Sequence, residues 1–337
     1  MSINQQACLA AIEQEMRAAV ASPRSDLTPF HNMLAYHLGW VDERFQPTKT
    51  DSGKRIRPLL CLLACQAAGG DWHAALPPAA AIELVHNFSL IHDDIEDNSP
   101  TRRGRPTVWK IWGLSQGINV GDGMLTLAHM AILRSQAQSP AAAPAAMDIL
   151  HRAVLSLCHG QYLDIHFEGR LDVTEELYLA MIGGKTASLL AASAQLGALL
   201  GESGAQAEHY RQFGYELGLA YQMIDDLLGI WGEPAVTGKP AADDIVSRKM
   251  TLPVIHTLRS SPLGEELAAL YRQERLAAAD VVLAVGILER SGAREYTRQL
   301  AAQHQSSSLR ALDAAQPREP AAGALRELAQ ALTARLK

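Results

Sequence analysis

HNFSLIHDDIEDNSPTRRGR, residues 86–105, is the stretch that decides the fold. Apolar residues recur at helical spacing just before and within its first half, at Leu84, Val85, Phe88 and Ile91. This periodicity predicts a helix with one apolar face. The helix ends in four acids, Asp93, Asp94, Glu96 and Asp97. At about 3.6 residues per turn, Asp93 and Asp97 lie on one face with Asp94 close beside them.

The acidic helix end is followed by a break and then by arginines. Pro100 and Gly104 interrupt the helix, and Arg102, Arg103 and Arg105 surround the break. Mg²⁺ binds through a few carboxylates, keeps waters and shares phosphate oxygens, while the planar guanidinium matches phosphate geometry. This set therefore suits Mg²⁺ and a phosphorylated ligand. A solvated acidic helix end is the alternative for any single acidic run.

A second acid pair favours the metal interpretation. Residues 214–231 are expected to form an apolar helix that ends in YQMIDDLLGIWG, with the pair at Asp225 and Asp226. A loop containing Lys239 follows, and a helix with Arg248 and Lys249 comes after it. The order of apolar helix, paired acids, loop and cations thus occurs twice. Two such units facing each other would form one metal and phosphate chamber closed by a hydrophobic well.

The rest of the chain is also helical in pattern. Ala and Leu dominate the long segments and aromatic residues make up only 5%, which suits helices. Further helices are expected at residues 5–22, 26–42, 108–112, 115–136 and 147–170. No strand alternation longer than a few residues is visible. The sequence therefore predicts an all-α fold, with a single domain over residues 1–337 because no composition boundary divides it.

Composition and missing motifs exclude several classes of protein. With 337 residues, 48% of them hydrophobic, the chain can bury a large core. The net charge of −6 argues against nucleic acid or an anionic membrane as the main partner. The absence of a signal peptide or a long uncharged apolar run predicts a cytoplasmic protein without stable membrane insertion. No Cys/His set completes a zinc site, and no Ser-His-Asp set, HExxH motif or nicotinamide fingerprint is visible.

The remaining residue types point to chemistry carried by a metal and by electrostatics. Acids would hold Mg²⁺, and Mg²⁺ with Arg and Lys would stabilise a departing diphosphate. The carbocation that remains survives only where water is excluded. Long apolar helices with few polar side chains provide such a surrounding.

In these features the sequence resembles the isoprenyl diphosphate synthases, the trans-prenyltransferase or polyprenyl synthetase family. The shared motifs lie in the family's order over about residues 53–253: GKRIRP, DDIED with TRRGRPTVW, GKT, YQMIDD, and TGKP with DDIVSRKMTLP. The resemblance implies a single all-α bundle around a deep central cavity, in a homodimer. It implies condensation of isopentenyl diphosphate with an allylic diphosphate by ionisation, attack of the double bond and proton loss. The released diphosphate is the expected proton acceptor.

The resemblance also implies a role for individual residues. Asp93, Asp94 and Asp97 match the first aspartate-rich motif, and Asp93 and Asp97 would be metal ligands. Asp225 and Asp226 match the second, with Asp225 the direct ligand. The positions that match isopentenyl diphosphate binding are Lys54, Arg57, His86 and Arg103. Those that match allylic diphosphate binding are Arg102, Lys185, Gln222, Lys239 and Lys249. Thr186 and Gln222 would steady the cation, so the expected catalytic set is Asp93, Asp94, Lys185, Thr186, Gln222 and Asp225.

Two features concern the details of activity. Gly229 stands at the fifth position of the second motif, where many family members carry aspartate. Phe88 lies five residues before Asp93 and can form a floor below the metals, while Ser89 leaves room beside it. Ordinary core packing of Phe88 is the alternative. By resemblance, a bulky residue there fits a farnesyl or geranylgeranyl product, and geranylgeranyl is favoured.

Two other functions remain open from the sequence. A class I terpene cyclase would carry one acid-rich motif and an Asn/Ser/Glu metal motif, whereas the second site here is a paired aspartate followed by lysines. A non-catalytic or modulatory synthase subunit would show degenerate motifs, and here Gly229 is the departure of note.

Overall fold

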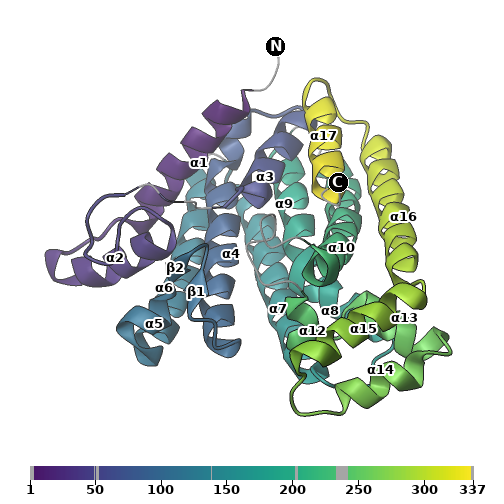
Figure 1. The fold of residues 1–337 in the computed structure, drawn as a ribbon. Helices are drawn as coiled ribbons and strands as arrows, with labels where there is room; N and C mark the ends of the chain where they lie inside the picture. The colour runs from purple at the N-terminus through teal and green to yellow at the C-terminus, as the bar shows by residue number, and fades with distance from the viewer. Residues whose placement is uncertain are drawn as a thin grey trace. The chain divides into compact units, whose positions relative to one another are not determined.

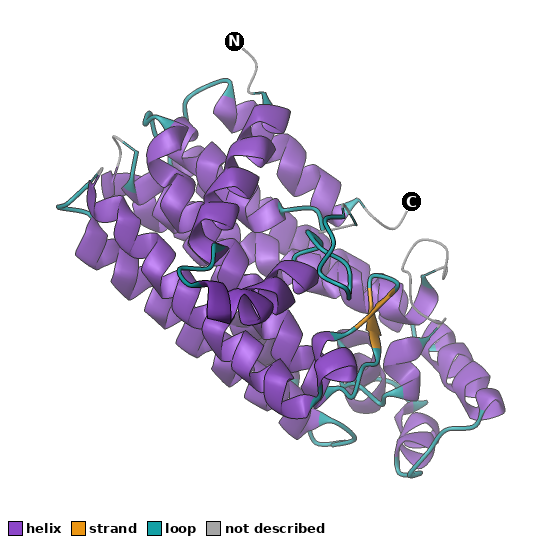
Figure 2. Ribbon diagram, turned by 90° about the vertical axis from the view of Figure 1, so that its left-hand side faces the viewer, coloured by secondary structure: helices purple, strands orange, loops and turns teal. Residues whose placement is uncertain are grey.

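Helices form almost all of the regular structure in the computed structural model, which describes residues 4–48, 50, 53–137, 139–201, 204–232 and 242–334 (Figure 2). In these ranges, β1 (Thr101–Arg102) pairs antiparallel with β2 (Arg105–Pro106), and one isolated bridge joins Val41 to Pro47. The predicted all-α class is therefore confirmed.

The chain divides into two compact units, which are described separately (Figure 1). Unit 1 comprises Met1–His151, Ser193–Glu208 and Pro317–Ala324. Its complete helices are α1 (Gln5–Val20), η1 (Ser25–Leu27), α2 (Thr28–His37), α3 (Ile56–Ala67), η2 (Trp72–Ala75), α4 (Leu76–Glu96), α5 (Val108–Trp112), α6 (Leu114–Leu133), η3 (Arg134–Ala137) and η5 (Gly204–Gln206). The prediction of a single domain over residues 1–337 stays a prediction.

Unit 2 comprises Arg152–Ala192, His209–Gln316 and Leu325–Lys337. Its complete helices are α8 (Glu175–Ile182), the π-helix η4 (Gly183–Ala187), α12 (Asp243–Val246), α13 (Leu252–Ser260), α14 (Gly264–Tyr271), α15 (Ala278–Arg290) and α16 (Ala293–Ala314). Four helices contribute residues to both units: α7 (Ala143–Phe167), α9 (Ser188–Leu199), α10 (Ala207–Trp231) and α17 (Ala321–Thr333).

Helix α4 is central to the packing of unit 1. Pro77 and Pro78 begin it, where the missing N–H groups cost nothing, and an almost uninterrupted apolar run from Ala79 to Val85 is buried. Such all-round burial requires partners on several sides, and α4 packs against α1, α3 and α6 (Figure 1). The acidic end of α4 is therefore carried by a helix that the core holds in place.

The core of unit 2 surrounds the last turns of α10 in the same way. Met223, Ile224 and Leu227 are buried with Tyr178 of α8 and Leu252 of α13. The second acid pair thus also lies on a helix with a buried apolar face.

Most helix boundaries differ from the expectation by a few residues, and the largest differences are in α2 and α10. The helix expected at 26–42 ends at His37, because the chain turns at Gly39 with a positive φ of 81° and then forms the Val41–Pro47 bridge. Helix α10 begins at Ala207 rather than at 214.

Two helical stretches, Trp72–Glu96 and Glu175–Leu199, are long and apolar enough to cross a membrane by length and composition. The most apolar window of each is 72% buried within the protein, as in the core helices of soluble proteins. Their apolar character is thus used in packing.

Candidate active site

The first acid cluster lies at the C-terminal end of α4. Asp93 is partly exposed in the last turn, and Asp97 is exposed at the cap, where its N–H donates to the Asp93 carbonyl at 2.9 Å. The two carboxylates therefore follow each other along the helix end, as predicted. A cation approaching from solvent can reach both side chains.

Asp94 has a different environment from its neighbours. Its side chain is 2% exposed, and its Oδ1 accepts a 2.7 Å hydrogen bond from Nε of Arg102. Burial raises the pKa of Asp94 to about 6, although the charge and hydrogen bond of Arg102 oppose the rise. Asp94 therefore orients an arginine that was predicted to bind the allylic diphosphate.

The β1–β2 hairpin holds the arginines that follow the first cluster. The turn is made by Arg103 and Gly104, both with positive φ, at 52° and 72°. It brings the Arg103 guanidinium against Gly53, where an added Cβ would lie only 2.8 Å from Nη2. Two motifs that begin 48 residues apart in the sequence, GKRIRP and TRRGRP, thus meet in unit 1.

Two members of the predicted isopentenyl diphosphate set, Arg57 and Arg103, lie near a third, His86. Burial lowers the pKa of His86 well below its usual value, and the nearby charges of Arg57, Arg103 and Arg102 lower it further. A neutral imidazole among arginines leaves the positive charge of the site to the guanidinium groups. Lys54, the fourth predicted member, is exposed at the start of the same motif.

His37 is a residue that the sequence reasoning missed. It lines a small pocket together with Tyr36, Asp94, Arg102, Arg103, Arg105, Pro106, Thr107 and Val108. Its buried Nε2 has no hydrogen-bond partner among the described residues, and burial with the neighbouring arginine charges lowers its pKa well below the usual value. No motif surrounds it in the sequence, so only the fold reveals its place among the arginines.

Arg105 serves the structure of this region. Its guanidinium donates to the carbonyls of Tyr36 and Val41 at 3.2 and 2.8 Å and to Oγ1 of Thr50 at 2.9 Å. Its side chain also lies 4.0 Å from the centre of the Tyr36 ring. These contacts separate Arg105 from Arg102 and Arg103, with which the sequence grouped it.

The second acid cluster lies near the end of α10, in unit 2. Asp225 is exposed, whereas Asp226 is 4% exposed. Asp226 accepts hydrogen bonds from Tyr178 Oη at 2.8 Å, Gln222 Nε2 at 3.0 Å and the Leu252 N–H at 3.1 Å. Burial raises the pKa of Asp226 to about 7, and the charge of Asp244 adds to the rise while the hydrogen bonds oppose it. Of the two acids, Asp225 is thus placed for a cation and Asp226 for holding the surrounding side chains.

Thr186 and Gln222 form a direct pair, with the Thr186 hydroxyl donating to Gln222 Oε1 at 2.6 Å. Thr186 lies in the π-helical turn η4, a form that is frequent at functional sites. An added Cβ at Gly160 of α7 would lie 2.0 Å from the Lys185 nitrogen, so only glycine permits this close backbone approach. The role that Thr186 and Gln222 were predicted to share stays a prediction.

Two predicted diphosphate-binding lysines share one carboxylate. Lys185 Nζ lies 2.6 Å and Lys249 Nζ 3.9 Å from Asp164 Oδ2. Burial alone would raise the pKa of Asp164, but the two ammonium charges and the Lys185 hydrogen bond outweigh it and lower the pKa. Asp164 was given no role from the sequence. Lys239, the third predicted lysine, lies outside the described residues.

Gly229, the departure in the second motif, faces another carboxylate. An added Cβ there would lie 1.9 Å from Oδ2 of Asp244. Asp244 therefore fills the space that a side chain at position 229 would need, and it brings a carboxylate to this side of the second cluster.

Phe88 and Ser89 lie on α4 as predicted, one turn before the first acids. Phe88 is 5% exposed, with its ring edge-on to His92 at 5.7 Å between ring centres. The Ser89 hydroxyl donates to the His86 carbonyl at 2.8 Å. Their role in product length stays a prediction.

The donor set fits Mg²⁺ that is shared with a substrate. Within the described ranges, no three His, Cys, Asp or Glu side chains lie close enough together to hold a metal by themselves. Mg²⁺ commonly takes one or two carboxylates, several waters and phosphate oxygens. Asp93 with Asp97, and Asp225 in unit 2, provide carboxylates of this kind.

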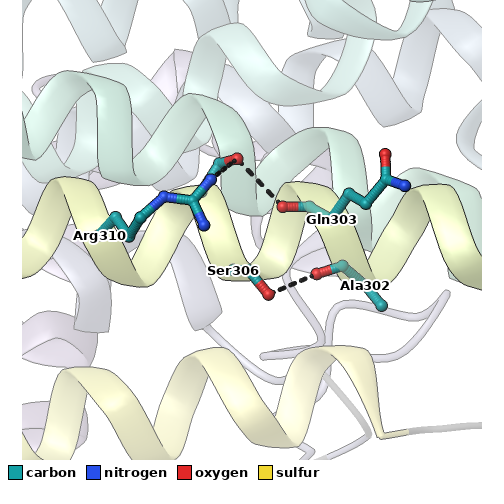
Figure 3. Close-up of a pocket in the computed structure, with 5 residues that line it drawn as sticks. Ala302, Gln303, Ser306 and Arg310 are labelled. Carbon is teal, nitrogen blue, oxygen red and sulfur yellow. Dashed lines mark hydrogen bonds between the residues drawn. The ribbon is translucent and has the colours of Figure 1, made fainter.

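A shallow hollow on α16 has none of these features. It is lined by Ala302, Gln303, Ser306, Ser307 and Arg310 (Figure 3). Ser306 and Ser307 donate to carbonyls one turn earlier in the same helix, at 2.9 and 3.0 Å. Without a carboxylate in its lining, it offers no ligand for the predicted metal.

Comparison with known proteins gives consistent matches along most of the chain. The family model described as polyprenyl synthetase matches residues 39–288. A (2E,6E)-farnesyl diphosphate synthase of Mycobacterium tuberculosis is 45% identical over 278 residues, which cover 81% of this chain and 77% of the relative. A geranylgeranyl diphosphate synthase of the same species is 42% identical over 289 residues, covering 84% and 81%.

Solved structures agree with these matches. A polyprenyl synthetase from Streptomyces coelicolor A3(2) has a TM-score of 0.89 and 35% identity, covering 97% of this chain and 98% of that chain. A geranylgeranyl pyrophosphate synthetase from Pyrococcus horikoshii has a TM-score of 0.86 and 31% identity, covering 98% and 96%.

Proposed function

Because this chain belongs to the polyprenyl synthetase family and is a short-chain trans-prenyltransferase, we propose that it condenses isopentenyl diphosphate with an allylic diphosphate and depends on Mg²⁺. The observation that carries the proposal is the arrangement of each acid cluster. In unit 1, the helix that ends in Asp93 and Asp97 also carries Asp94, which orients Arg102. In unit 2, Asp164 holds Lys185, and the next residue, Thr186, donates to Gln222 on the helix that carries Asp225.

The isopentenyl diphosphate would bind in unit 1. Arg57 and Arg103 supply positive charge next to the neutral His86, which can donate one hydrogen bond without adding repulsion. Arginine suits this task because its planar guanidinium can donate two parallel hydrogen bonds to the oxygens of a phosphate. Lys54 would add a further cation at the exposed side.

The allylic diphosphate would bind the lysines of unit 2. Asp164 keeps Lys185 and Lys249 close together before the ligand arrives, so their two ammonium groups are already placed for an anion. In unit 1, Arg102, held by Asp94, would offer a guanidinium to a diphosphate. Asp93 and Asp97 in unit 1, and Asp225 in unit 2, would each bind Mg²⁺, which would neutralise the charge of a leaving diphosphate. The Thr186–Gln222 pair would present its oxygens to the cation that forms.

The product is proposed to be farnesyl or geranylgeranyl diphosphate. Both kinds of synthase occur among the relatives, at 45% and 42% identity. Phe88 supports a short product because a buried aromatic ring one turn before Asp93 would limit the room for a growing chain. Of the two lengths, geranylgeranyl is the one favoured by the sequence.

A homodimer is proposed as the working form. Helix α6 exposes several large apolar side chains, Leu114, Ile118, Met130 and Leu133, with exposed fractions between 41% and 58%. Covering such side chains in a subunit contact is favourable. Light scattering coupled to size exclusion tests this. The cytoplasmic location and the lack of a nucleic-acid partner stay predictions from the sequence.

The proposed function is tested by incubating the purified chain with Mg²⁺, isotope-labelled isopentenyl diphosphate and each allylic primer in turn. The expected result is one labelled prenyl diphosphate of discrete length. A cyclised hydrocarbon with released diphosphate would indicate a cyclase instead. No turnover with any primer would contradict the stand-alone synthase.

A further inference from the structure

A buried ion pair joins the GKRIRP motif to helix α4. Nη1 of Arg55 is 2.7 Å from Oε1 of Glu83, and the two residues are only 8% and 3% exposed. Glu13 of α1 approaches the same guanidinium at 3.6 Å. Two charges are costly to bury unless each is paired with good geometry, so this contact constrains both side chains strongly.

The backbone at Arg55 makes the constraint more specific. Arg55 is the N-cap of α3 and lies in the left-handed region, with φ 49° and ψ 36°. Residues other than glycine seldom adopt this conformation, and they keep it where the surroundings hold them. At Arg55, the ion pair between its side chain and Glu83 of α4 holds the backbone in this conformation.

The acceptor is also fixed in place. Asn87, one turn after Glu83 on α4, donates from Nδ2 to Glu83 Oε1 at 3.1 Å and to the Glu83 carbonyl at 2.7 Å. The Glu83 carboxylate therefore has a second partner that sets its direction toward Arg55.

The ion pair joins the two segments that carry the predicted isopentenyl diphosphate ligands. Lys54 precedes Arg55 and Arg57 follows two residues later, while His86 is three residues after Glu83 on α4. Arg57 is close enough to His86 to lower its pKa. A change in the direction of the chain at Arg55 would move Lys54 and Arg57 relative to His86.

We propose that Arg55 and Glu83 are positioning residues for isopentenyl diphosphate, acting through Lys54 and Arg57. This inference rests on the proposed function. The pair holds the left-handed turn at the start of α3 and so fixes where the two cations stand relative to α4, which carries His86. Because the pair lies within unit 1 and the lysines predicted to bind the allylic diphosphate belong to unit 2, we expect it to leave allylic diphosphate binding unaffected.

The first test is Glu83→Gln, which keeps the shape of the side chain and removes its charge. We expect the KM for isopentenyl diphosphate to rise about tenfold, because a small misplacement of its binding groups weakens its binding. The KM for the allylic diphosphate should change less than about twofold.

Since breaking a buried pair can unfold a protein, a second variant combines Arg55→Met with Glu83→Leu. Replacing both members of a buried ion pair by apolar side chains is often tolerated. The same rise in the isopentenyl diphosphate KM is expected in it.

The control is Glu15→Gln, which breaks the 2.9 Å pair between Glu15 and Arg134 in the same unit. It should alter thermal stability at most and leave both KM values unchanged. A lower melting temperature with unchanged KM values in both test variants would overturn the inference, as would an equal rise in both KM values.

Failure of the proposed function gives a different result. The unmodified enzyme would then show no turnover with any primer, and calorimetric titration with inorganic diphosphate would replace the kinetic comparison. About tenfold weaker diphosphate binding in Glu83→Gln would still support the positioning role, because misplaced cations bind any diphosphate less well. Equal diphosphate binding in both proteins would overturn it.

Discussion

The hydroxyl of Tyr178 donates a 2.8 Å hydrogen bond to Oδ2 of Asp226, and both side chains are buried. The other carboxylate oxygen accepts from Gln222, whose amide oxygen in turn accepts from Thr186. A residue of α8 thus determines, through Asp226, which way the Gln222 amide faces. Tyr178 was not among the residues selected from the sequence.

Replacing Tyr178 by Phe removes one donor from a buried carboxylate and leaves the ring in place. We expect a loss of about 1–3 kcal/mol in unfolding free energy, since a buried acceptor is left with one partner fewer. The kcat should fall about tenfold because Gln222 is held less firmly. Urea unfolding and steady-state kinetics measure the two effects.

The matched control is Tyr271→Phe, because the buried hydroxyl of Tyr271 has no hydrogen-bond partner among the described residues. Equal effects in the two variants would contradict the prediction.

Introducing at position 229 the aspartate that the family resemblance leads us to expect should harm this protein. The Cβ of Gly229→Asp would lie 1.9 Å from Asp244 Oδ2, so one of the two carboxylates must move. We expect a loss of about 1–3 kcal/mol from overpacking, together with reduced activity. Combining Gly229→Asp with Asp244→Gly should recover most of the loss in thermal melts and in turnover. If the single variant is as stable and active as the original protein, Asp244 does not occupy this space.

The stability of the protein should depend on the neutral form of His86. Its pKa in the folded protein lies well below the ordinary value of 6.5, so the unfolded chain binds more protons below that pH. The contribution of His86 to the unfolding free energy is therefore complete above about pH 6.5. As the pH falls below this value, the contribution decreases by up to about 1.4 kcal/mol per pH unit. His37 adds a loss of the same sign.

Urea unfolding between pH 7.5 and 5.5 tests this directly. His86→Gln should reduce the slope of unfolding free energy against pH, whereas the same change at the exposed His209 should leave it as it was. An unchanged slope in His86→Gln would show that the imidazole titrates normally in the folded protein.

Removing the Phe88 ring should lengthen the product. The side chain is 5% exposed, so Phe88→Ala leaves space that additional isoprene units can enter. A stability loss of about 3–5 kcal/mol is expected at the same time. Phe167→Ala is the control, because Phe167 is similarly buried, at 3% exposure, and belongs to unit 2. Chromatographic sizing should show longer prenyl diphosphates in Phe88→Ala and the original length in Phe167→Ala. An unchanged length in both would mean that Phe88 is ordinary core.

The parts of the site that follow from local pattern were predictable. Asp93 and Asp97 are placed by helical spacing, and the ends of α4 and α10 follow from apolar periodicity followed by acids. The all-α class follows from the same periodicity. These features depend on residues a few positions apart.

The parts that depend on tertiary contacts were not predictable. Asp226 and Tyr178 are 48 residues apart, so neither residue type nor spacing indicates their hydrogen bond. The π-helical turn at Lys185 depends on close approach of the backbone at Gly160 in another helix. Likewise, Arg105 stands beside two predicted ligand arginines in the sequence, and only its contacts with Tyr36, Val41 and Thr50 reveal a structural role.

The central claim, that both acid clusters act in the condensation, is tested most directly by measuring incorporation of labelled isopentenyl diphosphate in Asp93→Asn and Asp225→Asn. Glu96→Gln, a change at an exposed acid of the same helix end as Asp93, is the control. We predict that each aspartate variant loses at least about a hundredfold in kcat, as expected when a developing charge loses its electrostatic partner. Glu96→Gln should remain close to the unmodified enzyme. Near-normal incorporation in either Asp93→Asn or Asp225→Asn would contradict the account.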